Sequence, residues 1–177
     1  MAAGATLDRR AAPVAASLPG TSFWFLNGAN GGLDNLAPLF PGQDEASDLA
    51  GIQARSTTET GKFGMIGGES NQAMENLMAV YGKTAVEIAK ERGFADADYT
   101  LSYANSWSDT ALGKQMGESM VDDGAGGMFV YANELGLGTI NAAIEKGAKV
   151  IGWSSDQTTI DPNSVVASVD FQFATMY

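Results

Sequence analysis

Polar, small and aromatic residues stand directly after four short apolar runs of this sequence. The residues placed to meet a ligand are Gly68, Asn105, Ser106, Trp107, Asn133, Gly136, Ser154 and Asp156. An indole such as Trp107 can stack on a planar ring, Asn133 and Asp156 can form hydrogen bonds, and Gly136 allows close approach to the backbone. These groups predict non-covalent binding of a small polar or aromatic solute.

The two side chains that serve most often in catalysis and metal binding are missing, because the chain has no cysteine and no histidine. Their absence excludes thiolate chemistry, a serine–histidine–aspartate triad and any histidine or cysteine metal site. No clustered pair of carboxylates stands out either. We therefore expect a protein that is not an enzyme and that needs no metal and no cofactor, and an enzyme on a doubly wound fold is the least favoured reading.

Each of these motifs also has a purely structural reading. Gly67-Gly68 and the Gly136-Leu137-Gly138 element are compatible with ordinary turns between strand and helix. Trp107 could belong to the core or to an interface between lobes, and Asp109 is better read as a helix cap than as a ligand. Asp156 and Gln157 could bind hydroxyl groups or could hold a long loop in place.

The elements that must position these residues alternate along the second part of the chain. We expect strands at 62–66, 99–103, 128–131, 149–153 and 165–169, and helices at about 70–92, from about 109, and at 137–146. This order predicts an α/β fold, a parallel sheet with helices on both faces. Ligands of such sheets bind beyond the carboxyl ends of the strands, which is where the residues above stand.

The helix boundaries carry recognisable signals. Ser70 or Asn71 can cap the start of the first helix, Gly93 can end it, and Asp109 can cap the second. The segment from Gly124 to Gly127 should break the chain before the third strand.

The first part of the chain gives weaker signals for secondary structure. Residues 1 to about 60 look irregular and rich in glycine, alanine and proline, with possible strands at 22–26 and 35–40 and a possible helix at 43–55. Two strands and two helices are too few for an independent sheet of ordinary size.

The charge balance is strongly acidic, with 10 Lys and Arg against 21 Asp and Glu and a net charge of -11. Such a surface argues against a nucleic-acid partner and against docking on an anionic membrane. No stretch approaches the length of a membrane span, and Met1 to Pro13 does not resemble a signal peptide.

Taken in order, the motifs resemble those of Bmp (basic membrane protein) solute-binding proteins, the group similar to purine nucleoside receptors. Gly61 to Gly68 resembles the family string GKVGFIGG, and Tyr103 to Asp109 resembles Y-x-G-S-F-x-D. Ala132 to Gly138 is similar to A-G-G-T-G-x-G, and Ile151 to Gln157 to I-G-V-D-x-D-Q. The shorter matches are Asp48-Leu49-Ala50-Gly51, Asp122 to Ala125 with Met128-Phe129, and Val166-Ala167-Ser168-Val169.

The resemblance implies a lobe of a type I periplasmic-binding-protein fold, in which two lobes close on a solute that an ABC permease then imports. It implies a remnant of the first lobe at 1–60, the second lobe at 61–170 and a return toward the first lobe at 171–177. It also implies a nucleoside-like ligand and an extracytoplasmic protein, in the periplasm or as a surface lipoprotein, although the chain has no lipid-bearing cysteine. The family carboxylate expected to hold the ribose falls on Ser154, and the basic residue expected after S-V falls near Phe171.

A different class of function remains open beside solute binding. A lone lobe would expose a surface that normally faces its partner, and exposed apolar patches favour oligomers. Phe23, Trp24 and the tail 171–177 are the candidates for such a surface, so a truncated lobe that self-assembles without a ligand is the alternative.

Overall fold

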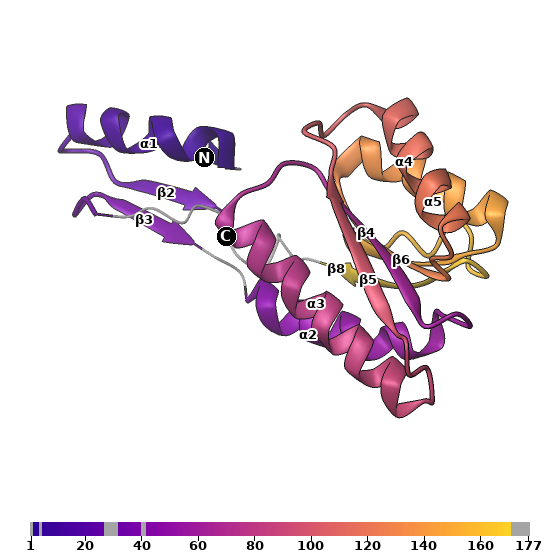
Figure 1. The fold of residues 1–177 in the computed structure, drawn as a ribbon. Helices are drawn as coiled ribbons and strands as arrows, with labels where there is room; N and C mark the ends of the chain where they lie inside the picture. The colour runs from indigo at the N-terminus through magenta and orange to yellow at the C-terminus, as the bar shows by residue number, and fades with distance from the viewer. Residues whose placement is uncertain (1, 4, 27–31, 40–41, 171–177) are drawn as a thin grey trace. The chain divides into compact units, whose positions relative to one another are not determined.

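The computed structural model describes residues 2–3, 5–26, 32–39 and 42–170, and it divides into two compact units, Met1–Gln43 and Asp44–Tyr177 (Figure 1). The expected division at residue 60 concerns lobes of a family fold, and it stays a prediction. The expected return of the chain at 171–177 lies outside the described residues.

The first unit is a small parallel sheet with one helix. Strands β1 (Ala2–Ala3), β2 (Phe23–Leu26) and β3 (Leu36–Leu39) lie in that order, and α1 (Ala5–Ser17) precedes β2. The sequence does not predict α1, because Pro13 interrupts its alanine-rich run and removes a backbone donor. The expected strands at 22–26 and 35–40 are present.

The second unit is the α/β layer structure that the sequence predicts. Its five-stranded sheet is parallel throughout, in the order β5-β4-β6-β7-β8. Its strands are β4 (Lys62–Gly67), β5 (Asp98–Tyr103), β6 (Gly127–Tyr131), β7 (Lys149–Ser154) and β8 (Val165–Asp170). Its helices are α2 (Gln43–Gln53, which starts at the last residue of the first unit), the 3-10 turn Ala54–Ser56, α3 (Gln72–Glu91), α4 (Thr110–Asp122) and α5 (Asn133–Lys146).

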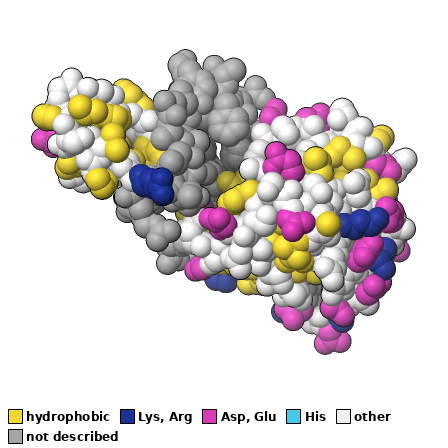
Figure 2. Space-filling model, turned by 90° about the horizontal axis from the view of Figure 1, so that it is seen from above, with side chains coloured by type: hydrophobic (Ala, Val, Ile, Leu, Met, Phe, Trp, Pro, Cys, Tyr) yellow, Lys and Arg dark blue, Asp and Glu magenta, His cyan; other side chains and the backbone are white. Residues whose placement is uncertain are grey.

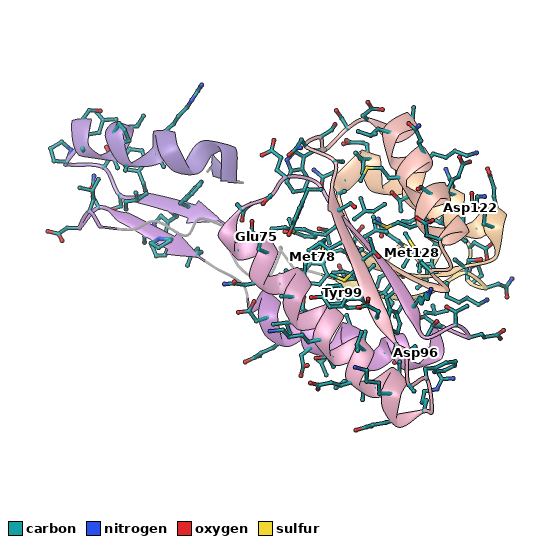
Figure 3. The ribbon with its side chains drawn as sticks, in the orientation of Figure 1. Glu75, Met78, Asp96, Tyr99, Asp122 and Met128 are labelled. Atoms are coloured by element: carbon teal, nitrogen blue, oxygen red, sulfur yellow. The ribbon has the colours of Figure 1, made fainter. Side chains whose placement is uncertain are left out.

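Helices cover both faces of this sheet. The α2 and α3 side buries Phe63, Met65, Tyr81 and Phe129, and the α4 and α5 side buries an equally apolar set that includes Met128. Figure 3 shows Met78 and Tyr99 between α3 and the sheet, and Met128 toward α4 and α5. Strands buried on both faces explain the continuous apolar runs of the sequence.

Side chains cap α3 and α4 as expected. Asn71 accepts a hydrogen bond from the Met74 backbone at 3.0 Å, and Asp109 accepts one from the Leu112 backbone at 2.9 Å. Each cap satisfies a backbone donor that the first helical turn leaves open. Gly93, which follows α3, has a φ of +99°, as the end of a helix requires.

Helix α5 begins earlier than the sequence suggests. The sequence predicts a helix from about Leu137, whereas α5 starts at Asn133. One glycine on each helix allows the contact between α5 and α4, since a Cβ on Gly138 of α5 would collide with the Thr110 carbonyl oxygen, and one on Gly113 of α4 with the Leu135 carbonyl oxygen. The two helices therefore pack backbone against backbone.

None of the helices described is both long and apolar enough to cross a membrane.

Candidate functional site

Three residues with left-handed backbone stand at the carboxyl ends of three strands of the sheet, β5, β6 and β7. Asn105 follows β5 with a φ of 53°, Asn133 follows β6 with a φ of 36°, and Ser154 ends β7 with a φ of 77°. They are the described non-glycine residues with positive φ, and all three belong to the predicted ligand set. Asparagine tolerates this conformation, but serine seldom adopts it, and such strain is concentrated at binding sites.

A pocket opens at the ends of β6 and β7. It has a volume of about 320 Å³ and is lined by Val130, Ala132, Asn133, Glu134, Gly136, Leu137, Trp153, Ser154, Ser155 and Gln157. Asn133, Gly136 and Ser154 from the predicted set thus meet around one cavity. Gly136 is buried, and a Cβ built there would lie 3.0 Å from Val130 Cγ1. The space beside the Gly136 Cα is therefore largely filled by Val130.

The other predicted residues lie outside the lining of this pocket. Trp107 is half-buried, and its ring fills the space that a Cβ on Gly68 would occupy, so Gly68 gives room to an indole. The Trp107 carbonyl also accepts a hydrogen bond from the Leu135 backbone at 3.2 Å, which ties the loop after β5 to α5. Stacking of Trp107 on a ligand stays a prediction.

Ser106 and Asp156 are engaged in local turns. The Ser106 hydroxyl accepts hydrogen bonds from the backbones of Ser108 and Asp109 at 3.3 and 3.2 Å. Asp156 is exposed and accepts from the Thr158 hydroxyl at 2.6 Å and from its backbone at 2.9 Å. The Thr158 side chain and then its backbone lower the pKa of the Asp156 carboxyl. A ligand would have to share these groups with the loops.

Gln157 holds the long loop after β7. Its side-chain oxygen accepts from the Trp153 backbone at 3.2 Å, while its own backbone donates to the Ser168 hydroxyl at 3.0 Å. This matches the structural reading of the motif, in which Asp156 and Gln157 tie down the loop.

Aromatic rings form a continuous series from this edge into the core. Trp107 meets Tyr131 edge-on at 6.2 Å, and Tyr131 meets Trp153 at 5.1 Å between ring centres. Trp153 contacts Phe129 at 5.4 Å, and Phe129 stacks on Tyr81 at 4.2 Å. Edge-to-face pairs stabilise beyond the area they bury, so these contacts help to hold Trp153, which lines the pocket, in place.

Two features of the site were not in the predicted set. Glu134 lines the pocket, although it is not among the residues that the sequence predicts to meet a ligand. The Tyr103 hydroxyl, at the end of β5, is shielded from solvent without a hydrogen-bond partner among the described residues. Burial, and then the nearby Glu75, raise the pKa of Tyr103.

The geometry offers no group of three or more acidic side chains, among those described, that could hold a metal ion. The pocket combines polar backbone and side-chain atoms with an apolar wall, as sites for small solutes do. Fold and site together define one lobe of a protein of the periplasmic-binding type.

Comparison with known proteins gives the family. A model described as ABC transporter substrate-binding protein PnrA-like (Bmp) matches residues 1–172, so the chain belongs to the Bmp family of ABC transporter substrate-binding proteins. The resemblance inferred from the motifs is thereby confirmed.

Relatives of known sequence cover the chain only in part. Basic membrane protein D of Borreliella burgdorferi is 30% identical over 136 residues, which are 76% of this chain and 38% of the relative. The ABC transporter nucleoside-binding protein BmpA of Lactococcus lactis is 25% identical over 140 residues, 79% of this chain and 38% of the relative. The chain thus spans about 38% of the length of these two relatives.

Solved structures confirm the fold class. An ABC transporter solute-binding protein of Aeropyrum pernix has a TM-score of 0.81 at 23% identity, covering 93% of this chain and 48% of that one. A transcriptional activator of the comK gene of Bacillus halodurans has a TM-score of 0.75 at 19% identity, covering 99% of this chain and 58% of that one. These likenesses concern the fold alone.

Proposed function

We propose that this chain is part of a solute-binding protein of an ABC importer and that its second unit contributes one wall of the solute site. The observation that carries the proposal is the pocket at the ends of β6 and β7, with the strained Asn133 and Ser154 in its lining. Binding needs no covalent step, which agrees with a chain that contains no cysteine and no histidine.

A nucleoside-like molecule is the proposed solute, delivered to an ABC permease outside the cytoplasm. Support comes from the BmpA relative, whose name describes a nucleoside-binding protein. The pocket volume of about 320 Å³ lies at the small end of the range for ligand sites, as expected for one wall of a divided site.

The test is a thermal-shift and calorimetric titration of this chain with nucleosides, bases and sugars. A solute at 100 times its dissociation constant adds about 2.7 kcal/mol to the free energy of unfolding. Ser155→Trp, which places an indole in the pocket, should abolish the shift. Thr159→Trp is the matched control, because Thr159 is exposed and does not line the pocket.

A nucleoside shift that survives Ser155→Trp unchanged would place binding elsewhere. No shift with any solute would contradict solute binding by this chain.

The first unit supports a second candidate function, self-association. Its sheet carries α1 on the face of Phe25 and Leu36, which are 1% and 4% exposed. Trp24 and its neighbour in register, Ala37, point to the other face, where Trp24 is 60% exposed and Leu39 is half-buried. Parallel sheets are normally covered on both faces.

The charge distribution of the sequence favours a second copy of the chain as the partner that covers this exposed face. Residues 1–43 contain two arginines and two aspartates and no other charged residue, so the net charge of -11 belongs wholly to residues 44–177. Two copies can therefore meet at their first units with the least repulsion between charges.

Light scattering over a concentration series tests this candidate. The wild-type chain should form dimers as concentration rises, and Trp24→Ser should shift it to the monomer. Leu49→Ser, at an apolar residue of α2 that is 67% exposed, should leave the size unchanged. A wild-type monomer at all concentrations would refute self-association.

A further inference from the structure

The pocket at the ends of β6 and β7 contains one charged side chain, Glu134. No other residue of its lining is acidic or basic, and the carboxylate of Glu134, an exposed residue, has neither an ion pair nor a hydrogen bond with any described residue. An unpaired carboxylate on a pocket wall attracts a positive group on a ligand and repels a negative one.

Helix N-termini are the usual reason to expect the opposite preference, because their free N–H groups favour anions. Three helices start at this edge, and each has its own polar or acidic side chain there. Asn71 caps α3 and Glu75 lies in its first turn, Asp109 caps α4, and Glu134 lies in the first turn of α5. Since a helix terminus is equivalent to about half an elementary charge, a full carboxylate outweighs it.

The described basic side chains of the second unit do not restore a positive field at this edge. Five of them lie at the starts of strands or the ends of helices, which is the opposite edge in this fold: Lys62, Lys90, Arg92, Lys146 and Lys149. Lys83 is exposed near the middle of α3, and Lys114 is paired with Glu145 at 2.7 Å. Among described side chains, the residues at the strand ends and helix starts that carry a charge are all acidic.

The surface view agrees with this distribution. Seen from above, the second unit presents acidic side chains among neutral and hydrophobic ones, and fewer basic side chains (Figure 2). Figure 3 places Glu75 near the start of α3, and Asp96 near the far end of that helix.

We infer that the solute carries a positively charged group, such as a protonated amine, which Glu134 receives, while Leu137 and Val130 contact its apolar part. The inference rests on the proposed function, because it names the charge class of the solute at that same site. It assigns to Glu134 the selection against anionic forms of an otherwise similar solute.

Three probes that share one scaffold separate the charge effect from binding itself: adenosine, 5′-amino-5′-deoxyadenosine, which is a cation at neutral pH, and adenosine 5′-monophosphate. Calorimetry at low and at moderate salt should give the amine about tenfold tighter binding than adenosine, and the monophosphate at least tenfold weaker binding. The preference should shrink with added salt, because the Debye length falls to about 10 Å at 0.1 M.

Two variants test whether Glu134 causes the preference for the amine over adenosine. Glu134→Gln should bring the affinity ratio of amine to adenosine close to one. Glu91→Gln makes the same chemical change at the C-terminal end of α3, which lies at the opposite edge of the sheet from the pocket. It should leave the affinity ratio unaltered.

The remaining outcomes contradict the charge inference, either alone or together with the proposed nucleoside-like solute. If adenosine binds as tightly as the amine, or if Glu134→Gln keeps the preference, the charge inference is wrong and solute binding stands. If none of the three probes binds, the nucleoside-like solute of the proposed function fails, and the charge inference fails with it.

Discussion

Left-handed backbone at Asn105, Asn133 and Ser154 is the feature that most clearly separates this sheet edge from ordinary turns. The sequence marks all three residues by their position after apolar runs. For the two asparagines the conformation could have been foreseen, since asparagine enters this region readily. For Ser154 it could not, because serine seldom adopts this conformation and local sequence does not mark it.

Tyr81 carries a buried hydroxyl that has no visible function. The ring is fully buried and stacks on Phe129, and the hydroxyl has no hydrogen-bond partner among the described residues. An unsatisfied buried polar group costs about 1–3 kcal/mol, whereas the stacking needs only the ring. Tyr81→Phe should therefore stabilise the chain by about 1 kcal/mol.

Urea unfolding followed by circular dichroism measures this change. Tyr99→Phe is the control, because Tyr99 is half-buried and its hydroxyl is not an unsatisfied buried group, so it should change the stability little. A loss of stability in Tyr81→Phe as large as that of a core truncation would show that the hydroxyl has a partner.

The same residue gives a signed dependence on pH. Burial raises the pKa of Tyr81 far above its usual value, so the folded state keeps the proton when the unfolded state loses it. Above a pH of about 10 the unfolded state binds fewer protons, and stability falls by up to about 1.4 kcal/mol per pH unit. The advantage of Tyr81→Phe over the wild type should therefore widen in alkaline buffer.

At the scale of elements, the contact between α4 and α5 depends on glycine. The glycines of 136–138 suggested a loop, because glycine is a poor helix former in isolation. In the folded chain, Gly138 and Gly113 instead let two helix backbones touch. The competing effect is tertiary packing, which a single sequence does not display.

Gly138→Ala should lower the free energy of unfolding by about 2 kcal/mol. A methyl group there must displace the Thr110 carbonyl, and overpacking of this kind costs about 1–3 kcal/mol, more than the helix propensity that alanine gains. Gly20→Ala, where a Cβ meets no atom within 4 Å, should leave the unfolding curve in place. A neutral Gly138→Ala would mean that α4 and α5 can separate without loss.

Most elements of the second unit were predictable from local signals. The strands β4, β6 and β7 contain continuous apolar runs, and Asn71 and Asp109 cap helices as their positions suggest. The strand order was not predictable, since it depends on which neighbours each strand finds. In the first unit, the 13 residues of α1 went unseen because a helix with Pro13 in its interior is stabilised by packing on β2 and β3.

For the whole molecule, the important feature is the separation of charge along the chain. The first unit is formally neutral and the second carries the entire net charge of -11. An average over the whole sequence hides this difference, and it hides the acidic character of the sheet edge as well. The fold creates that edge by bringing strand ends and helix starts together from distant parts of the sequence.

The series of rings from Trp107 to Tyr81 should determine the fluorescence and the near-ultraviolet circular dichroism of the protein. Tyr131 lies between two indoles, which accept excitation energy from tyrosine, so its own emission should be almost fully quenched. Rings held at fixed angles also give strong circular dichroism in the near ultraviolet. Trp153 belongs to this series and also lines the pocket. The binding of a solute should therefore shift the emission wavelength of the intrinsic tryptophan fluorescence, without any added dye.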